Sequence, residues 1–418
     1  MSHQKIAIIG AGASGLICAI EASKNDTNHI TIFEQNNKPA KKIIASGNGK
    51  CNISNSNLDY TNYYSSSKSY TKFLNFVLNE FSFKKLQSYF LSIGLDTFIK
   101  EDGKAYPLNN ESKSVSNALL GSLNDKLNID IVNKKIDNIE SKDNKYIIDD
   151  KSFDMLVVAS GSNASVKSED NDMNFGLKIA KQFGHNIMPI YPALVQLDLD
   201  YAYLDILSGL KQKAEVVLYI DDEQILSAHD DILFTKYGIS GLAILDISTI
   251  ISKTLNTKSD KNDTKHNIQI ELNLFTQYSS KELEKKILAL KKSIPNYTFA
   301  LVLDGFISSK LTNTILKIFQ IEREKMISEI GTKTIKQIIS KLTSWKFDIS
   351  CTRDLKYAEV AGGGVDIDEI DKTTMQSKLQ ENIYFCGEVL DVVGQRGGYN
   401  LHFAFGSGYI AGKDISTR

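Results

Sequence analysis

The chain has 418 residues and a mass of 46.6 kDa, which is too long for one small module and predicts two or three domains. Hydrophobic residues make up 42% and charged residues 24%, a balance that excludes disordered and fibrous proteins. The formal net charge of −1 argues against a protein that coats nucleic acid or an anionic membrane over its whole surface, although a local basic face stays open.

Arginine is rare in this chain, because only four of its 49 basic residues are arginine and the rest are lysine. A chain that uses lysine almost everywhere is expected to keep arginine where a planar guanidinium is needed. Two of the four, Arg353 and Arg396, lie near the motif segments described below. We therefore expect these two side chains to bind a carboxylate, a phosphate or the substrate itself.

The sequence also bears on location and metals. No stretch approaches the roughly 18 to 20 apolar residues that span a bilayer, so no membrane association is expected. The four cysteines are scattered, with no CxxC pair and no histidines at zinc spacing, so we expect no metal site and a reducing, cytoplasmic location. Cys18 and Cys386 lie in apolar patterns and are predicted to be core thiols.

The chain opens with a βαβ pattern: a strand at 5–9, a glycine turn, a helix at 14–24 and a strand at 29–34. The following segment predicts three helices and several strands. The helices are expected at 71–79, 83–92 and 112–123, a hairpin at 98–106, and strands at 129–139, 145–148 and 153–159.

The texture changes after about residue 191. Residues 192–274 alternate in short β-like runs, including a solvated polar segment at 257–265, and residues 280–341 read as helical. The chain ends with a strand at 383–386 and a helix containing 401–411. Because this last pair resembles the opening unit, the two chain ends predict one nucleotide domain interrupted by an insertion.

The turn after the first strand is a G-x-G-x-x-G sequence with Gly10, Gly12 and Gly15. Gly10 would allow the tight turn, Gly12 the approach of a pyrophosphate, and Gly15 the packing of helix on strand. Ala13 and Ser14 open the helix, whose N-terminus would face the phosphates. Glu34 ends the second strand, where a carboxylate can accept hydrogen bonds from a ribose diol.

The C-terminal segment indicates a flavin rather than a nicotinamide. A strand runs into Gly387 and Glu388, and a glycine-rich turn then leads through Gly398 into Tyr399, Asn400 and Leu401 at the start of a helix. Backbone N–H groups at such a helix start would face the flavin and stabilise its reduced, anionic form. A simple NAD-binding domain does not require a second strand–turn–helix of this kind.

A third segment suits a loop laid against phosphates or the flavin ring. It runs from Lys41 and Lys42 through the polar, glycine-containing sequence at 46–52. Its two glycines, its small polar residues and its lysine are the features that suit such a loop.

Taken together, these segments resemble the BaiN/RdsA (YhiN-like) family of FAD-dependent oxidoreductases. The matching stretches are GAGASG at 10–15, AKKIIASGNGKCNISN at 40–55, YPALVQL at 191–197, FTKYGISG at 234–241 and YFCGEVLDVVGQRGGYNLHFAFGSGYIAG at 384–412. They occur in order and cover most of the chain. Where the family usually shows Ala-Thr-Gly-Gly after the third strand, this chain has Ala-Ser-Gly-Ser, with Gly161 at the cofactor position.

The resemblance implies an α/β fold: a split, Rossmann-like FAD-binding domain of the two-dinucleotide-fold type, with an inserted β-barrel-like and helical region. The expected parts are 1–190 for the first portion of the FAD domain, 191–275 for a β-rich substrate domain, 276–345 for a helical subdomain and 346–418 for the returning β region and the rest of the FAD domain. The resemblance also places the three glycines and Glu34 on the adenosine diphosphate side, and Gly387, Glu388, Gly398 and residues 399–401 on the flavin side. It further implies that the cofactor is lined by Lys42, Ser46, Gly47, Gly49, Lys50, Cys51 and Asn52.

A reductase of this type would pass hydride from flavin N5 to an electron-poor carbon–carbon double bond. Because the chain has no second G-x-G-x-x-G, we expect NAD(P)H to visit the flavin transiently as electron donor. The candidate proton donors are Tyr237, Tyr399, His402 and Cys51, with Tyr237 preferred as the catalytic acid. His402 is grouped with Arg353 and Arg396 as a substrate-binding candidate.

The charge is distributed unevenly. Residues 281–346 carry a net charge of +7 and the remainder about −8, and a basic segment on an acidic body favours an RNA-sized polyanion. The family resemblance implies that the substrate is either a small unsaturated molecule or ribosomal RNA, in which a uridine would become dihydrouridine. Two rivals stay open: a folate-using flavin methyltransferase with Cys51 as its nucleophile, and a non-catalytic FAD-containing sensor or interaction module.

Overall fold

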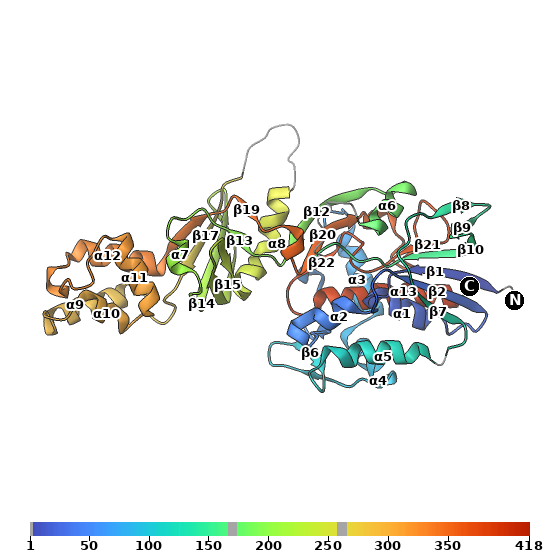
Figure 1. Cartoon of the computed structure of the whole chain (residues 1–418), viewed down its shortest axis with the longest axis horizontal. Helices are drawn as coiled ribbons and strands as arrows, with labels where there is room; N and C mark the ends of the chain where they lie inside the picture. The colour runs from blue at the N-terminus through green and yellow to red at the C-terminus, as the bar shows by residue number, and fades with distance from the viewer. Residues whose placement is uncertain (1–2, 125, 166–173, 257–265) are drawn as a thin grey trace. The chain divides into compact units, whose positions relative to one another are not determined.

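The structure is a computed structural model that describes residues 3–124, 126–165, 174–256 and 266–418. It divides into two compact units (Figure 1). The first unit contains Met1–Tyr191 and Val360–Arg418, and the second contains Pro192–Glu359. The polar segment at 257–265 lies outside the described residues. None of the described helices is long and apolar enough to cross a membrane.

The core of the first unit is a five-stranded parallel sheet in the order β21-β11-β1-β2-β7. Four of its strands come from the N-terminal part and one from the C-terminal part: β1 (Gln4–Ile9), β2 (Asn28–Glu34), β7 (Ile129–Asn133), β11 (Met155–Val158) and β21 (Ile383–Phe385). The apolar runs of β1, β11 and β21 are buried, as expected of parallel strands covered on both faces. The expected α/β, split Rossmann-like fold is confirmed.

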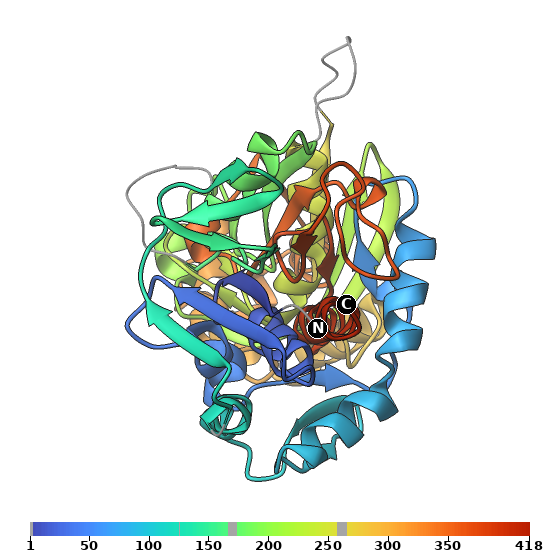
Figure 2. The same ribbon diagram turned by 90° about the vertical axis from the view of Figure 1, so that its right-hand side faces the viewer.

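Two helices from opposite ends of the chain pack against each other beside this sheet. They are α1 (Ala13–Ala22) and α13 (Tyr399–Ser416), and Figure 2 shows α13, in dark red, beside the blue strands β1 and β2. The contact is close because glycines of α13 face the backbone of α1: a Cβ added at Gly408 would lie 2.3 Å from Ser14 O, and one at Gly412 would lie 2.4 Å from Cys18 O. Cys18 and Cys386 are core thiols, as predicted.

The remaining helices and strands of the first unit surround the parallel sheet. The predicted hairpin is present as β5 and β6, and Ser82 caps its predicted helix by accepting a hydrogen bond from Lys85 N. These elements are α2 (Lys41–Ala45), β3 (Ser54–Asn55), β4 (Tyr63–Tyr64), α3 (Tyr70–Glu80), α4 (Phe83–Ser92), β5 (Thr97–Ile99), β6 (Lys104–Pro107), α5 (Ser112–Asn124), β8 (Glu140–Lys142), β9 (Lys145–Ile148), β10 (Lys151–Phe153), α6 (Phe175–Gln182), β12 (Ile187–Ala193), β20 (Val360–Val365) and β22 (Val393–Gly394).

The second unit combines a seven-stranded sheet with helices around one hydrophobic core. The strand order is β18-β17-β14-β15-β16-β13-β19, and all the pairs are antiparallel. The strands are β13 (Leu197–Asp198), β14 (Lys211–Ile220), β15 (Glu223–Phe234), β16 (Gly238–Ser240), β17 (Ile268–Asn273), β18 (Trp345–Asp348) and β19 (Cys351–Thr352).

This sheet curls like a barrel. Its two end strands, β18 and β19, follow one another in the chain and are separated only by Ile349 and Ser350, so the sheet must bend until its ends meet. Residues 346–359, which the sequence analysis grouped with the C-terminal part of the chain, belong to this second unit.

Three helices of the second unit, α9, α10 and α11, begin at a side-chain cap. Ser279, Thr298 and Ser308 each accept a hydrogen bond from a backbone N–H one turn into the following helix. The helices are α7 (Leu204–Leu207), α8 (Leu242–Asn256), α9 (Ser280–Ser293), α10 (Phe299–Asp304), α11 (Ser309–Ile318) and α12 (Thr332–Thr343). The helical prediction for 280–341 is confirmed, but the β-like prediction for 192–274 is wrong for α8.

The α1–α13 contact predicts a specific loss of stability. Gly412→Ala places a methyl group against backbone that cannot rotate away, so we expect about 1–3 kcal/mol of destabilisation and a lower thermal midpoint of unfolding. Gly121→Ala is the matched control, because Gly121 is exposed in α5 with open space at its Cβ position. Its midpoint is expected to stay constant or rise. Equal shifts for both variants would contradict the close packing.

Candidate functional site

The three glycines of the turn after β1 have two structural roles, close packing and access to open space. Gly10 has φ +107°, and a Cβ added there would lie 2.5 Å from Ala159 O; a Cβ at Gly15 would lie 2.0 Å from Gly10 O. Both positions are therefore fixed by packing. A Cβ at Gly12 would meet nothing within 4 Å, so this position borders open space. That space adjoins the N-terminus of α1, where a large group would be received.

The start of α1 is available to an anion. Ala13 and Ser14 form its first turn, and no side chain caps this end. The first N–H groups of a helix lack partners within the helix and carry partial positive charge, which suits a phosphate. Ser14 contributes differently, because its hydroxyl donates to Cys386 O at 3.3 Å and so links this turn to the C-terminal strand.

Glu34 lies buried at the end of β2, beside the glycine turn. Its Oε2 accepts the Ala11 N–H at 2.9 Å, and its Oε1 accepts the backbone and side-chain N–H groups of Asn36 at 2.8 and 2.7 Å. These bonds fix the direction of the carboxylate. They also leave lone pairs on a carboxylate that has about four acceptor positions, so a ribose hydroxyl can still be bound.

Lys42 and Glu388 join distant parts of the chain. Lys42 Nζ lies 2.9 Å from Glu388 Oε2 and donates to Ser162 O at 3.0 Å, while Glu388 Oε1 accepts the Ala361 N–H at 3.0 Å. Gly161, with φ +66°, borders the same carboxylate. The structure therefore brings together the predicted residues Lys42, Gly161 and Glu388 at the carboxyl edge of the sheet.

The loop at 46–52 follows a left-handed path. Gly47, Asn48 and Gly49 have φ of +57°, +53° and +84°, and Gly47, Gly49 and Lys50 are exposed. Ser46 is turned inward, because its hydroxyl donates to Ile43 O at 2.7 Å. The loop thus presents backbone and Lys50, rather than Ser46, to its surroundings.

Cys51 and Asn52 close this loop with buried groups. The Cys51 thiol is fully buried, and burial raises its pKa to about 12, so it offers no surface or thiolate to a ligand. In this structure Cys51 therefore lacks the exposed thiol that its expected cofactor contact and its candidacy as proton donor or nucleophile would use. Asn52 Oδ1, by contrast, is a buried acceptor without a hydrogen-bond partner among the described residues.

The C-terminal glycine loop packs directly on the segment at 52–54. Gly398 has φ +97°, and a Cβ there would lie 2.4 Å from Ser54 O and 2.7 Å from Asn52 Oδ1. Gly387 is equally tight, because a Cβ there would lie 2.4 Å from Ser14 Oγ. These two glycines therefore allow close packing between the chain ends.

The residues that open α13 differ in their surroundings. Asn400 braces the preceding loop, since its side chain accepts from Gly394 N at 2.7 Å and donates to Gly394 O at 2.8 Å. Tyr399 is buried, which raises the pKa of its phenol, and Leu401 is partly buried against the core. Their side chains are engaged by the protein, so the backbone N–H groups of this helix start are what they can offer to a ligand.

His402 is a structural residue. Its side chain is fully buried; Nδ1 lies 2.8 Å from Ser54 Oγ and Nε2 lies 2.7 Å from Phe81 O. Burial lowers its pKa to about 4, so the ring is neutral near pH 7 and both nitrogens are occupied. In this structure His402 therefore has no exposed ring nitrogen for its expected roles in substrate binding and proton donation.

The two arginines that we singled out lie in different units. Arg396 is partly buried in the C-terminal glycine loop. Burial raises the pKa of the neighbouring Tyr106, and the positive charge of Arg396 partly offsets that rise. Arg353 lies in the second unit, where its guanidinium contacts the ring of Tyr237, the preferred acid.

The sequence analysis did not identify two residues that hold this region together, Asp391 and Asn55. Asp391 is fully buried, and its Oδ2 accepts hydrogen bonds from the Ser65 hydroxyl and the Ser66 N–H at 2.9 and 2.6 Å. Asn55 donates to Gly397 O at 3.1 Å. A signal for Asp391 was present, because a single acid interrupts the apolar run Val389–Val393. Nothing in the sequence distinguishes Asn55 from its polar neighbours.

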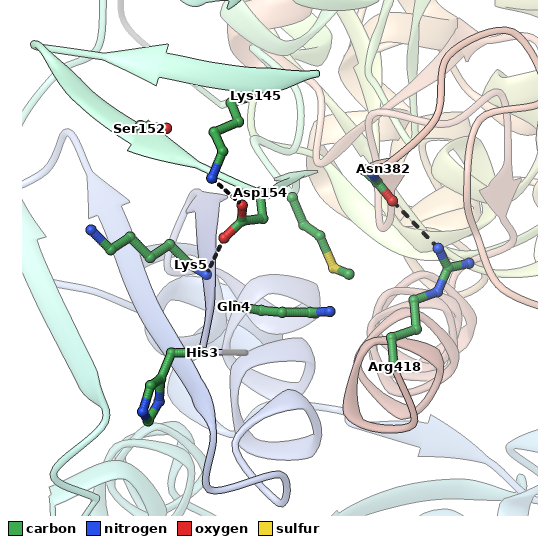
Figure 3. A pocket seen from close by; sticks show the side chains of 9 residues that line it. His3, Gln4, Lys5, Lys145, Ser152, Asp154, Asn382 and Arg418 are labelled. Carbon is green, nitrogen blue, oxygen red and sulfur yellow. Dashed lines mark hydrogen bonds and ion pairs between the residues drawn. The ribbon is translucent and has the colours of Figure 1, made fainter. Parts of the chain in front are cut away.

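A cavity of about 590 Å³ lies away from all these residues (Figure 3). Asp154 is bound there by Lys145 Nζ and the Lys5 backbone, and Arg418 donates to Asn382. These groups lie at the amino end of β1 and the start of β11, whereas the glycine turn follows the carboxyl end of β1. Ligands of such sheets bind at the carboxyl ends, so this cavity is not the nucleotide site.

The parallel sheet, the glycine turn at the N-terminus of α1 and the acid that ends β2 define a dinucleotide-binding protein with a Rossmann-type domain. The chain belongs to the HI0933-like protein Rossmann domain family, which it matches over residues 4–414. This match spans both ends of the chain and the insertion between them.

Three curated relatives match nearly the whole chain. A 3-dehydro-bile acid delta(4,6)-reductase from Clostridium scindens is 28% identical and covers 99% of this chain and 99% of its own. A ribosomal RNA dihydrouridine synthase from Haemophilus influenzae is 29% identical over 98% of both chains. The enzyme of the same name from Escherichia coli is 26% identical over 98% of this chain and 97% of its own.

The buried His402 predicts acid sensitivity. Its folded pKa of about 4 lies below the unfolded value near 6.5, so the unfolded chain binds more protons between these pH values. Stability is therefore lost as the pH falls from 6.5 towards 4, by about 3 kcal/mol for this residue. Denaturant unfolding from pH 7 to pH 4.5 should show a smaller pH dependence for His402→Gln than for wild type. His229→Asn, which alters an exposed histidine, should retain the wild-type dependence; a wild-type dependence in His402→Gln would contradict the assignment.

Proposed function

We propose that this protein is an FAD-dependent oxidoreductase, an NAD(P)H-driven reductase that passes hydride from flavin N5 to an unsaturated carbon–carbon bond. The observation that carries the proposal is the meeting of the two chain ends on one parallel sheet: the Gly12 turn and the Gly398 loop lie in the same unit, linked through Ser14 and Cys386. The reductase named among the relatives supports the reaction type.

The residues present fit FAD at both of its ends. At the adenosine end, Gly12 borders open space, α1 presents its uncapped N-terminus and Glu34 retains acceptor capacity. At the flavin end, Asn52 Oδ1 is a buried acceptor that lacks a partner, and an N–H group of a bound flavin would satisfy it. Lys42 and Glu388 would lie between these ends, along the pyrophosphate and ribityl region.

Bound FAD would supply the two-electron chemistry, since a reduced flavin delivers hydride to an electron-poor double bond. The chain would supply the electrostatics. The N-terminus of α13 is preceded by Gly398 and has no side-chain cap, so the N–H groups of its first turn carry partial positive charge. Such a helix start stabilises negative charge that develops next to it.

Burial narrows the choice of proton donor. Of the four candidates, Cys51 and His402 are fully buried and Tyr399 is buried, whereas Tyr237 is exposed. We propose Tyr237 as the acid, with its phenol donating a proton to the substrate carbon. The electron donor is proposed to be NAD(P)H, bound transiently because the chain has a single G-x-G-x-x-G. The methyltransferase alternative loses its support with the burial of Cys51.

A second candidate reaction is the reduction of uridine in ribosomal RNA. The observation that favours it is the basic segment at 281–346, whose lysines are mostly exposed in the structure. Exposed lysines are what a phosphate backbone requires. The two relatives named ribosomal RNA dihydrouridine synthase each match 98% of this chain. The bond reduced would again be a carbon–carbon double bond.

The cofactor assignment is tested by Gly12→Leu. Because the Cβ of this variant meets no protein atom, the apo protein should keep its thermal midpoint, while the side chain fills the space for the pyrophosphate. We expect FAD affinity, measured by titration calorimetry, to fall at least about tenfold, or about 1.4 kcal/mol. Gly121→Leu, on an exposed face of α5, should bind FAD normally.

The same samples test whether NADH or NADPH reduces the bound flavin. NADH or NADPH should bleach the flavin of wild type in the absence of oxygen, whereas an inert FAD module would keep its colour. Purified protein without affinity for FAD would overturn the proposal.

The RNA candidate predicts a local effect of charge. The triple reversal Lys285→Glu, Lys292→Glu and Lys333→Glu removes exposed lysines of the second unit, so binding of a ribosomal RNA fragment should weaken more than about tenfold near 0.1 M salt and become less salt-dependent. The control reverses the exposed lysines 72, 84 and 113 of the first unit. Equal losses in both triples would contradict a dedicated surface. Deletion of the gene should remove one dihydrouridine from ribosomal RNA, and unchanged RNA would favour a small molecule.

A further inference from the structure

An arginine of the second unit is held between two tyrosine rings. Arg353 follows β19, Tyr237 lies between β15 and β16, and Tyr357 ends a short 3-10 helix, Leu355–Tyr357. The guanidinium carbon of Arg353 lies 4.0 Å from the centroid of each ring. The backbone is fixed as well, because the Arg353 N–H donates to Gln196 O at 2.9 Å. We call these three side chains the arginine stack.

The stack leaves the hydrogen-bonding edge of the guanidinium unused. The rings cover its two faces, and no hydrogen bond joins its N–H groups to a described residue. The nearest described carboxylate is Asp198, whose Oδ1 lies 3.6 Å from an Arg353 terminal nitrogen, beyond hydrogen-bond distance. The Arg353 side chain is 19% exposed, so solvent reaches it, and the residues Tyr237 and Tyr357 are 38% and 43% exposed.

The geometry explains why arginine stands here in a chain that otherwise uses lysine. A guanidinium is planar and weakly hydrated, so it can lie flat between two rings while its edge points outward with several N–H donors. A lysine ammonium would contact one ring as a point charge and lose the fixed direction. Holding a donor edge in one direction lowers the entropy cost of binding a second group.

We propose that the arginine stack is a binding site for an oxyanion, a carboxylate or a phosphate, which the edge of Arg353 binds through paired N–H···O bonds. Asp198 is the resident counter-charge and competes with the ligand. The exposed rings form the walls of the site, so a flat group attached to the oxyanion lies against them. That the oxyanion belongs to the reductase substrate rests on the proposed function; the binding of an oxyanion does not.

The scarcity of arginine makes the test direct. Protein labelled with ¹³C and ¹⁵N at the arginine guanidinium groups gives four side-chain signals, and Arg353→Lys assigns one by its disappearance. Benzoate, its neutral isostere benzamide, and inorganic phosphate are then titrated separately. We expect a saturable shift of the Arg353 signal with at least one of the two anions and none with benzamide. A response to benzoate alone identifies a carboxylate ligand, and tighter binding of phosphate identifies a phosphate ester.

Arg323 is the internal control, because it is already paired with Asp304 at 3.1 Å and hydrogen-bonded to Asn313. Its signal should stay in place. Failure of the Arg353 signal to move with either anion, or an equal and non-saturable movement of Arg323, would overturn the proposal.

Two variants separate ligand binding from a purely structural ion pair. Asp198→Asn removes the competing charge and should tighten anion binding several-fold, whereas a structural pair would show no binding in either protein. Tyr357→Leu removes one wall and should weaken the binding of benzoate, and Tyr297→Leu, an exposed tyrosine elsewhere in the unit, should not. These measurements do not involve flavin reduction. A colourless protein whose Arg353 still binds anions would therefore refute the proposed reductase while the site stands.

Discussion

The backbone contact between α1 and α13 is the constraint on which the nucleotide site depends. The turn that would receive the phosphates belongs to the first 15 residues, and the loop that would receive the flavin belongs to the last 35. They can form one site only if the chain ends are locked together. Gly408 and Gly412 allow that lock, because any side chain there would meet the backbone of Ser14 and Cys18. The pairing of β21 with β11 then aligns the two ends along one sheet edge.

The sequence alone correctly predicted elements that depend on neighbouring residues, such as a helix cap or a turn. The helix beginning after Ser82 and the hairpin at Gly103 are encoded by a cap and a turn residue, and both are present. Helix α8 was missed because its 15 residues include four Ile and two Thr, and these β-branched residues favour strands when tertiary packing is unknown. In the structure one face of α8 packs into the core of the second unit, and that burial outweighs the intrinsic preference.

The site shows a similar division. Glycine spacing assigned the tight turn to Gly10, the open approach to Gly12 and the helix packing to Gly15, and the structure divides the three positions in the same way. Gly10 and Gly15 are filled by neighbouring backbone, and only Gly12 borders open space. His402 and Cys51 were chosen for their chemistry beside glycine turns. Their burial arises from α13 packing on Ser54 and Phe81 and from the fold of the 46–52 loop, and a pattern along one chain carries no information about such contacts.

Charge has to be considered unit by unit. A net charge of −1 results from a basic segment in the second unit and an acidic remainder, so the total says little about either surface. The kind of cation matters as well as its number. The lysines of 281–346 are mostly exposed point charges suited to diffuse attraction, which is weakened by salt. Arg353 is different, because two rings fix its orientation and leave its donor edge open. Diffuse attraction raises the concentration of an anionic substrate near the unit, whereas an oriented guanidinium selects one oxyanion and sets its direction. A protein that acts on one double bond of a larger molecule needs the second property, since reduction at a defined carbon requires a defined orientation.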